Sequence, residues 1–178
     1  MLDPALYDVV RLGCAILLLA GAWHKFSAPA QFAEVVAGYA IAPRRFAKPL
    51  ARIVPLAEAG AAAAVILLRG PGLALSAALL GGYALVLSLN ILRGRAHVDC
   101  GCRAFGRRAV TLQWPMVARN VALAAVASVA ALVGRSTRPV QPLDVLTIVA
   151  SLLVLTLLYA SFDEFLALNS KSEAWRQA

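Results

Sequence analysis

Two cysteines, Cys100 and Cys102, stand one residue apart in a short polar segment between two long apolar stretches. The thiolate is the reactive form of cysteine, and nearby cations raise its fraction at neutral pH. His97 and Arg103 lie close to the pair in sequence, and Gly101 allows the tight backbone of a Cys-x-Cys ring. Such a ring should be strained, and strained disulfides are readily reduced. The pattern therefore predicts thiol–disulfide exchange by Cys100 and Cys102.

The cysteine pair is also compatible with two different roles. The cysteines could be unrelated small residues in a loop. Together with His97 and His24 they could offer four zinc ligands, but the spacing matches no common zinc motif, so we expect no metal. The third cysteine, Cys14, lies inside the first apolar stretch, where a cysteine usually acts as a small apolar residue. A third redox partner is the alternative for Cys14.

The composition indicates an integral membrane protein. Hydrophobic residues make up 61% of the 178 residues, and the mean hydropathy is +0.77. Only 15% of residues are charged, against roughly 25% in soluble domains. A net charge of +8 would suggest nucleic-acid binding in a soluble protein. Here the basic residues lie in short segments beside apolar stretches, which favours contact with lipid headgroups and no nucleic acid.

Five apolar stretches approach the roughly 20 residues that a helix needs to cross a bilayer. They cover residues 5–23, 50–68, 72–92, 115–133 and 143–162. A proline stands at or just before the start of the last four, where its missing N–H costs nothing. The first stretch has an acidic start and no cleavage site, so we expect a retained helix. The sequence predicts one all-α domain over residues 1–178, a polytopic membrane helix bundle with a four-helix core plus one.

The residues between the first two stretches predict a short interfacial helix. Four apolar residues repeat there with helical spacing: Phe32, Val35, Val36 and Tyr39. The segment is too short to span the membrane and would lie along its surface. Ser27 is the expected N-cap, and Pro43 the expected end.

The second and third stretches should form a hairpin, since only Arg69-Gly70-Pro71 separates them. Gly60 with its following alanines, and Gly81-Gly82, offer small surfaces that let membrane helices approach closely.

Glu58 lies near the middle of the second stretch. A carboxylate at that depth is costly and normally faces a partner or a cavity. The candidate partners are Arg119, His24 and Arg11, and the cluster would be either a structural ion pair or a proton relay. Arg119 could instead snorkel to the surface. His24 could belong to an aromatic and basic interface anchor or serve proton transfer to a thiol.

Three features together resemble the MauE family of methylamine utilisation membrane proteins, relatives of the DoxX-type four-helix proteins. They are Gly21-Ala22-Trp23-His24-Lys25-Phe26, the intramembrane Glu58, and Asp99-Cys100-Gly101-Cys102 followed by Phe105-Gly106. The family motif usually runs directly into Phe-Gly, whereas Arg103-Ala104 intervene here.

The resemblance implies a role in maturing the disulfide-rich small subunit of methylamine dehydrogenase in the periplasm. It implies a membrane-anchored thioredoxin-like partner, MauD, and Asp99 as part of the cysteine site. The helix arrangement is also similar to the vitamin K epoxide reductase bundle, which implies electron transfer to a membrane quinone. A non-enzymatic docking partner that stabilises the thioredoxin-like protein is the alternative function, and a transporter is a weaker one.

Two arguments predict opposite orientations of the chain in the bacterial inner membrane. With five spans, twelve Lys and Arg residues fall on the side of the cysteine segment and four on the other. The positive-inside rule places the cysteine segment in the cytoplasm. A cytosolic disulfide would face a reducing pool, so the chemistry favours a periplasmic segment.

Overall fold

The computed structural model describes residues 1–95 and 111–177, with side chains as far as residue 168. The helices are α1 (Pro4–Ser27), α2 (Pro29–Tyr39), α3 (Ala47–Leu68), α4 (Gly70–Leu92), α5 (Trp114–Val133) and α6 (Pro142–Gln177), with a 3₁₀ turn, η1 (Arg44–Phe46), before α3. Five of them are long and apolar enough to span a membrane, and no strand element occurs in the described residues. The prediction of an all-α, five-span membrane bundle is confirmed.

The helix ends follow from local chemistry. The Asp3 carboxylate accepts a hydrogen bond from the Ala5 N–H at 2.9 Å and caps α1. Proline stands at the first or second position of α4, α5 and α6, as the sequence predicts. It also stands in the first turn of α1 and α2. Gly134 ends α5 with a φ of 71°, which glycine adopts without strain.

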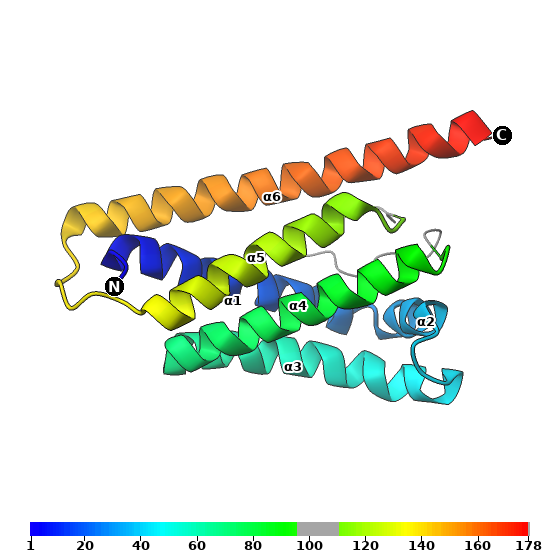
Figure 1. Ribbon diagram of the computed structural model, residues 1–178, viewed down its shortest axis with the longest axis horizontal. Coiled ribbons are helices and arrows are strands. Elements are labelled where there is room, and N and C mark those ends of the chain that lie inside the picture. Colours follow the sequence, from blue (N-terminus) through cyan, green and yellow to red (C-terminus); the bar gives the residue numbers. More distant parts are fainter. Residues whose placement is uncertain (96–110, 178) are drawn as a thin grey trace.

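The spans run antiparallel along one long bundle, and α2 lies at one end of it (Figure 1). We call this the α2 end: α4 ends there and α5 starts there. The hairpin between α3 and α4 turns at the opposite end and is closed by Gly72, where a Cβ would lie 2.3 Å from the backbone of Ala64. The expected close contacts at Gly60 and Gly81 are wrong, because a Cβ there would meet nothing within 4 Å. Ala61 and Ala62 are fully buried, as expected.

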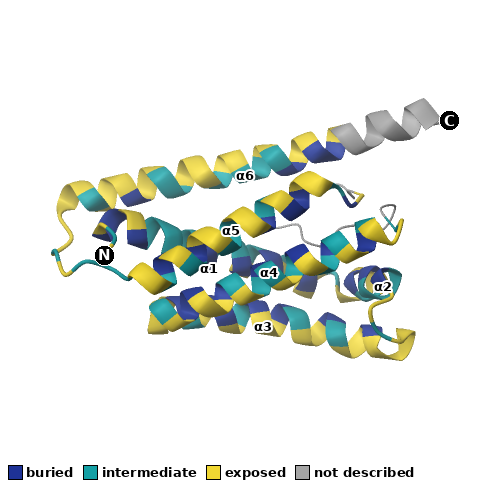
Figure 2. Cartoon of the chain, in the orientation of Figure 1, coloured by how far each residue is buried: buried dark blue, intermediate teal, exposed yellow. Residues whose placement is uncertain are grey.

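The short helix α2 is present, but its limits differ from those predicted. Ser27 is the last residue of α1, and its hydroxyl donates to the Trp23 carbonyl at 2.8 Å instead of capping α2. The helix ends at Tyr39, before Pro43, because Ala40 adopts a left-handed conformation. The apolar face of α2 is turned into the protein, where Phe32, Val35 and Tyr39 join a core with residues of α4, α5 and α6 (Figure 2).

Helix α6 is the least embedded span. Only 6% of its most apolar window is buried, against 28–39% in the other four spans. It runs along the outside of the bundle, beside α1 (Figure 1). At the opposite end its entry is fixed, because the Arg138 guanidinium contacts Asp3 at 3.1 Å and Asp144 at 2.9 Å. The core is thus a four-span bundle with a fifth helix attached to it.

Candidate functional site

A buried charged cluster joins Lys25 in the last turn of α1 to Glu58 in the middle of α3. The Lys25 Nζ lies 2.7 Å from one carboxylate oxygen of Glu58 and 2.9 Å from the other. Their side chains are only 2% and 3% exposed. A buried charge is tolerated when it is paired and hydrogen-bonded, so each residue offsets the desolvation cost of the other at this depth.

Tyr83 of α4 completes the cluster. Its hydroxyl donates to Oε1 of Glu58 at 2.5 Å, and its ring lies 5.5 Å from the Lys25 nitrogen. The Phe32 ring of α2 lies 5.4 Å from the same nitrogen, so two aromatic faces stabilise the cation. Gly21 leaves room, because a Cβ there would approach both Glu58 and Lys25 to 3.4 Å. Four helices therefore meet at one charge pair.

A small cavity of about 30 Å³ adjoins this cluster, lined among others by Lys25, Glu58, Tyr83, Asn120 and Tyr159. That volume suffices for a water molecule, which needs polar partners such as these. The arrangement can hold a neutral ion pair, exchange protons through a bound water, or fix the relative positions of α1, α3 and α4.

The partners expected for Glu58 are wrong. Arg11 pairs with Asp8 at 3.2 Å, near the opposite end. Arg119 lies in α5 and pairs with Asp163 of α6, with the Tyr159 ring 4.3 Å from its guanidinium. His24 lies half-buried one residue before the true partner, Lys25.

Lys25, Tyr83 and Asp163 are the residues of these clusters that the sequence analysis missed. A signal for Lys25 exists in its helical phase: Cys14, Leu18 and Gly21 form the buried face of α1, and position 25 continues it. Trp23 is 76% exposed, so the aromatic anchor and the lysine lie on different faces. A single interface anchor over residues 23–26 therefore does not describe this turn of α1.

An apolar slot of about 460 Å³ lies between α1, α5 and α6. Aliphatic side chains line most of it, and Arg119, Tyr159 and Phe162 stand among them. Cys14 borders the slot and is 6% exposed, packed among the residues of a small core at the opposite end. The expectation that Cys14 acts as a small apolar residue agrees with this burial.

The predicted exchange site lies outside the described residues. This applies to His97, Asp99, Cys100, Cys102 and Arg103. The segment that carries them joins the last turn of α4 to the first turn of α5, two helices that pack against each other. Its leading flank is anchored, because the Arg95 N–H donates to the Asn90 carbonyl at 2.9 Å and its guanidinium to the Tyr39 carbonyl at 3.4 Å.

Fold and site together define a multi-pass membrane protein with a buried charge cluster and a cysteine-bearing connection between two spans. The family model described as methylamine utilisation protein MauE matches residues 3–133, which is α1 to α5. The chain is 31% identical over 163 residues to MauE of Methylophilus methylotrophus, covering 90% of this chain and 86% of that protein. It is 34% identical over 161 residues to MauE of Paracoccus versutus, covering 89% and 86%. The chain belongs to the MauE family. No solved structure shows significant similarity to it.

Proposed function

We propose that the protein is a membrane thiol–disulfide exchange protein that serves methylamine utilisation. Cys100 and Cys102 would exchange with the cysteine pair of a membrane-anchored thioredoxin-like partner of the MauD type. The client would be the small subunit of methylamine dehydrogenase. The observation that carries the proposal is the pair of thiols one residue apart in a connection between two packed spans, in a member of this family.

The exchange balances without a further reactant. A thiolate of one pair attacks a sulfur of the other pair's disulfide and forms a mixed disulfide, while the leaving sulfur takes a proton. The second thiolate of the attacking pair then attacks the sulfur of its own pair in the mixed disulfide and forms a disulfide with it, while the other pair's sulfur leaves as a thiolate and takes a proton. Two electrons have passed from one pair to the other, and one dithiol and one disulfide remain. Nearby cations, Arg103 among them, favour the thiolate that each step needs.

The buried cluster supports this chemistry by holding the frame. Lys25, Glu58 and Tyr83 tie α1 and α3 to α4, whose last turn leads into the cysteine segment. Arg119 and Asp163 tie α6 to the first turns of α5, into which the same segment runs. We assign these residues a positioning role, because a cysteine pair that must meet a partner's disulfide needs a fixed base.

We place the cysteine segment in the periplasm and the helices in the inner membrane. The charge bias opposes this orientation, since the positive-inside rule counts Lys and Arg near the spans. Disulfides persist in the oxidising periplasm and are rare in the cytosol. A protein that forms disulfides in a client must therefore act on the oxidising side.

The test is mixed-disulfide trapping. Cys100→Ser and Cys102→Ser are each expressed with the thioredoxin-like partner, and complexes are resolved on gels without reductant. At least one variant should accumulate a reductant-sensitive complex, and both should lose mature dehydrogenase subunit. Cys14→Ser is the matched control and should behave like the parent protein. If the Cys100→Ser/Cys102→Ser double variant still matures the subunit, exchange is wrong and the docking alternative holds.

A test of the docking alternative needs surface residues of α2. Phe32 and Tyr39 are buried in the core, so replacing them would disturb folding itself. Gln31 and Glu34 lie on the exposed face of α2 and are the residues to vary. Gln31→Lys/Glu34→Lys should abolish maturation under the docking alternative and spare it under exchange.

A further inference from the structure

A cleft at the α2 end separates α2 from the start of α3. Its volume is about 430 Å³. Small residues line much of it, among them Ala33 and Ala37 of α2 and Ala51 of α3. The basic side chains of the cleft are Arg44, Lys48 and Arg52.

These cations follow one another at four-residue intervals, so they form a stripe on one face of η1 and α3. The stripe is about 12 Å long at the helical rise of 1.5 Å per residue. It follows the axis of α3, from η1 toward the middle of the span.

The charge of the stripe is mostly uncompensated. Arg44 contacts Glu34 across the cleft at 3.4 Å, but both side chains are more than three-quarters exposed, so this pair is weak. Lys48 and Arg52 have no acidic partner in the part of the chain that the structure describes. At the opposite end, by contrast, Arg135 and Arg138 pair with Asp8, Asp3 and Asp144.

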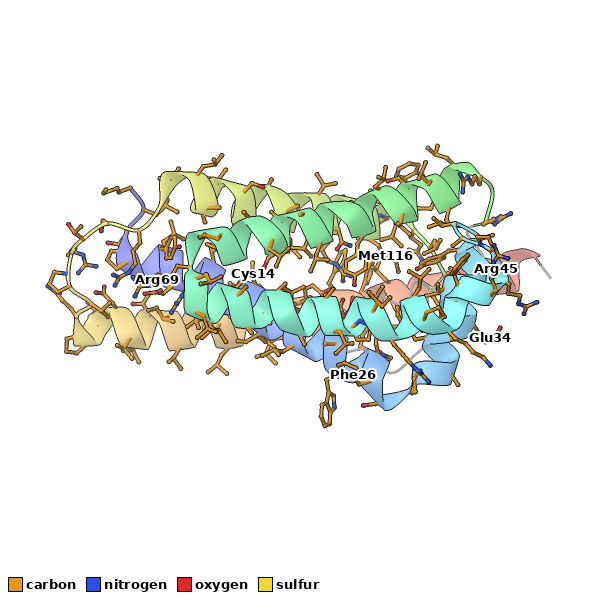
Figure 3. All side chains as sticks on the ribbon, turned by 90° about the horizontal axis from the view of Figure 1, so that it is seen from below. Cys14, Phe26, Glu34, Arg45, Arg69 and Met116 are labelled. Atoms are coloured by element: carbon orange, nitrogen blue, oxygen red, sulfur yellow. The ribbon has the colours of Figure 1, made fainter. Side chains whose placement is uncertain are left out.

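The stripe becomes apolar at greater depth. Leu56 comes one turn after Arg52 on the same face and is 60% exposed, and the neighbouring Ile53 is 56% exposed. Figure 3 shows Glu34 and Arg45 at the tip of this end, with Phe26 of α1 nearer the middle of the bundle. Positive charge at the tip followed by exposed hydrocarbon is the order in which a phospholipid presents its phosphate and its acyl chains.

We propose that this cleft binds the headgroup of an anionic membrane phospholipid. Arg44, Lys48 and Arg52 contact the phosphate, the alanines leave space for the glycerol moiety, and an acyl chain descends along Ile53 and Leu56. An acidic segment of a partner protein would match the charges but not the exposed hydrocarbon one turn deeper. The proposal does not depend on the exchange reaction.

The experiment measures lipid retention by native mass spectrometry. The full chain is reconstituted with equal amounts of phosphatidylglycerol and phosphatidylethanolamine and released from nanodiscs. The parent protein should retain phosphatidylglycerol preferentially. Each cation near a membrane surface contributes about fivefold to the binding of an anionic lipid. Lys48→Gln/Arg52→Gln removes two cations and should therefore lower the preference about 30-fold. Arg45→Gln/Arg93→Gln removes the same charge at the same end outside the cleft and should leave most of the preference intact.

Three outcomes would overturn the proposal. The parent protein could show no preference for the anionic lipid. The two double variants could lose the preference for the anionic lipid equally, which would indicate that lipid binding depends on the total charge of this end and not on the cleft. Lys48→Gln/Arg52→Gln could keep the lipid preference but lose the trapped partner complex, which would assign the cleft to an acidic protein surface. The mixed-disulfide trapping assay, repeated with the Lys48→Gln/Arg52→Gln substitutions, distinguishes a failure of the lipid proposal from a failure of the exchange proposal.

Discussion

At the scale of single residues, the decisive finding is the identity of the partner of Glu58. A lysine in the last turn of α1 neutralises it, and a tyrosine hydroxyl fixes one of its oxygens. Removing one member of such a buried pair leaves the other charge without compensation. Replacing both removes the pair and its desolvation cost together.

Lys25→Met and Glu58→Gln should each lower the free energy of unfolding by about 3 kcal/mol, since each leaves one buried charge unpaired. The double variant should recover most of this loss, because glutamine still accepts from the Tyr83 hydroxyl. The free energies of unfolding of the parent, the two single variants and the double variant are measured by chemical unfolding in a mild detergent, with tryptophan fluorescence as the signal. Equal and additive losses would show that the two side chains do not act as a pair.

At the scale of elements, the hairpin of α3 and α4 depends on one glycine. Gly72→Ala places a methyl group 2.3 Å from the backbone nitrogen of Val65, and backbone cannot move aside cheaply. The helices must separate, so the free energy of unfolding should fall by about 3 kcal/mol or more. Gly81→Ala is the control: it meets nothing and should be neutral or stabilising, since alanine favours helix by about 1 kcal/mol. A loss of similar size in both variants would contradict the close approach.

The attachment of α6 gives a second prediction at this scale. Asp163→Asn removes the carboxylate that holds Arg119 and should reduce the local opening free energy of α6 by about 2 kcal/mol, the worth of a charged hydrogen bond. Hydrogen exchange of α6 amides, compared with those of α3, measures it. Glu164→Gln changes the exposed neighbouring carboxylate and should have little effect. Faster exchange throughout the molecule would mean that the pair supports the whole bundle.

At the scale of the whole molecule, the sequence predicts the number and order of the spans and most of their limits. The predicted end of the fifth span at residue 162 is wrong, because α6 continues to Gln177. Hydropathy and the prolines at the helix starts depend on local chemistry, which can be read directly from one sequence. The partners of Glu58 and Arg119 depend on how each helix is rotated about its axis relative to its neighbours. That rotation follows from packing, at Gly72 and around Ala61 for example, and hydropathy does not encode it. The cysteine segment stays a prediction of sequence and family.

Orientation is the whole-molecule prediction. A membrane-impermeant maleimide applied to intact spheroplasts after mild reduction should label Cys100 and Cys102, because we place them in the periplasm. Cys14 is buried and should react only after denaturation, which provides an internal control. Labelling only in inverted vesicles would place the segment in the cytoplasm and agree with the charge bias.

The slot beside α6 has a practical consequence for handling the protein. The roughly 460 Å³ between α1, α5 and α6 is lined mostly by aliphatic side chains, so we expect the tails of surrounding lipids to enter it. A surfactant with a long alkyl chain can take their place during extraction. One with a short or bulky tail leaves α6 held by its contacts with α1, by the ion pairs of Asp144 and Asp163, and by Leu166 and Ala167 in the core at the α2 end. We therefore expect α6 to detach more readily during purification as the alkyl chain of the surfactant becomes shorter. This detachment should precede any unfolding of the four-span core.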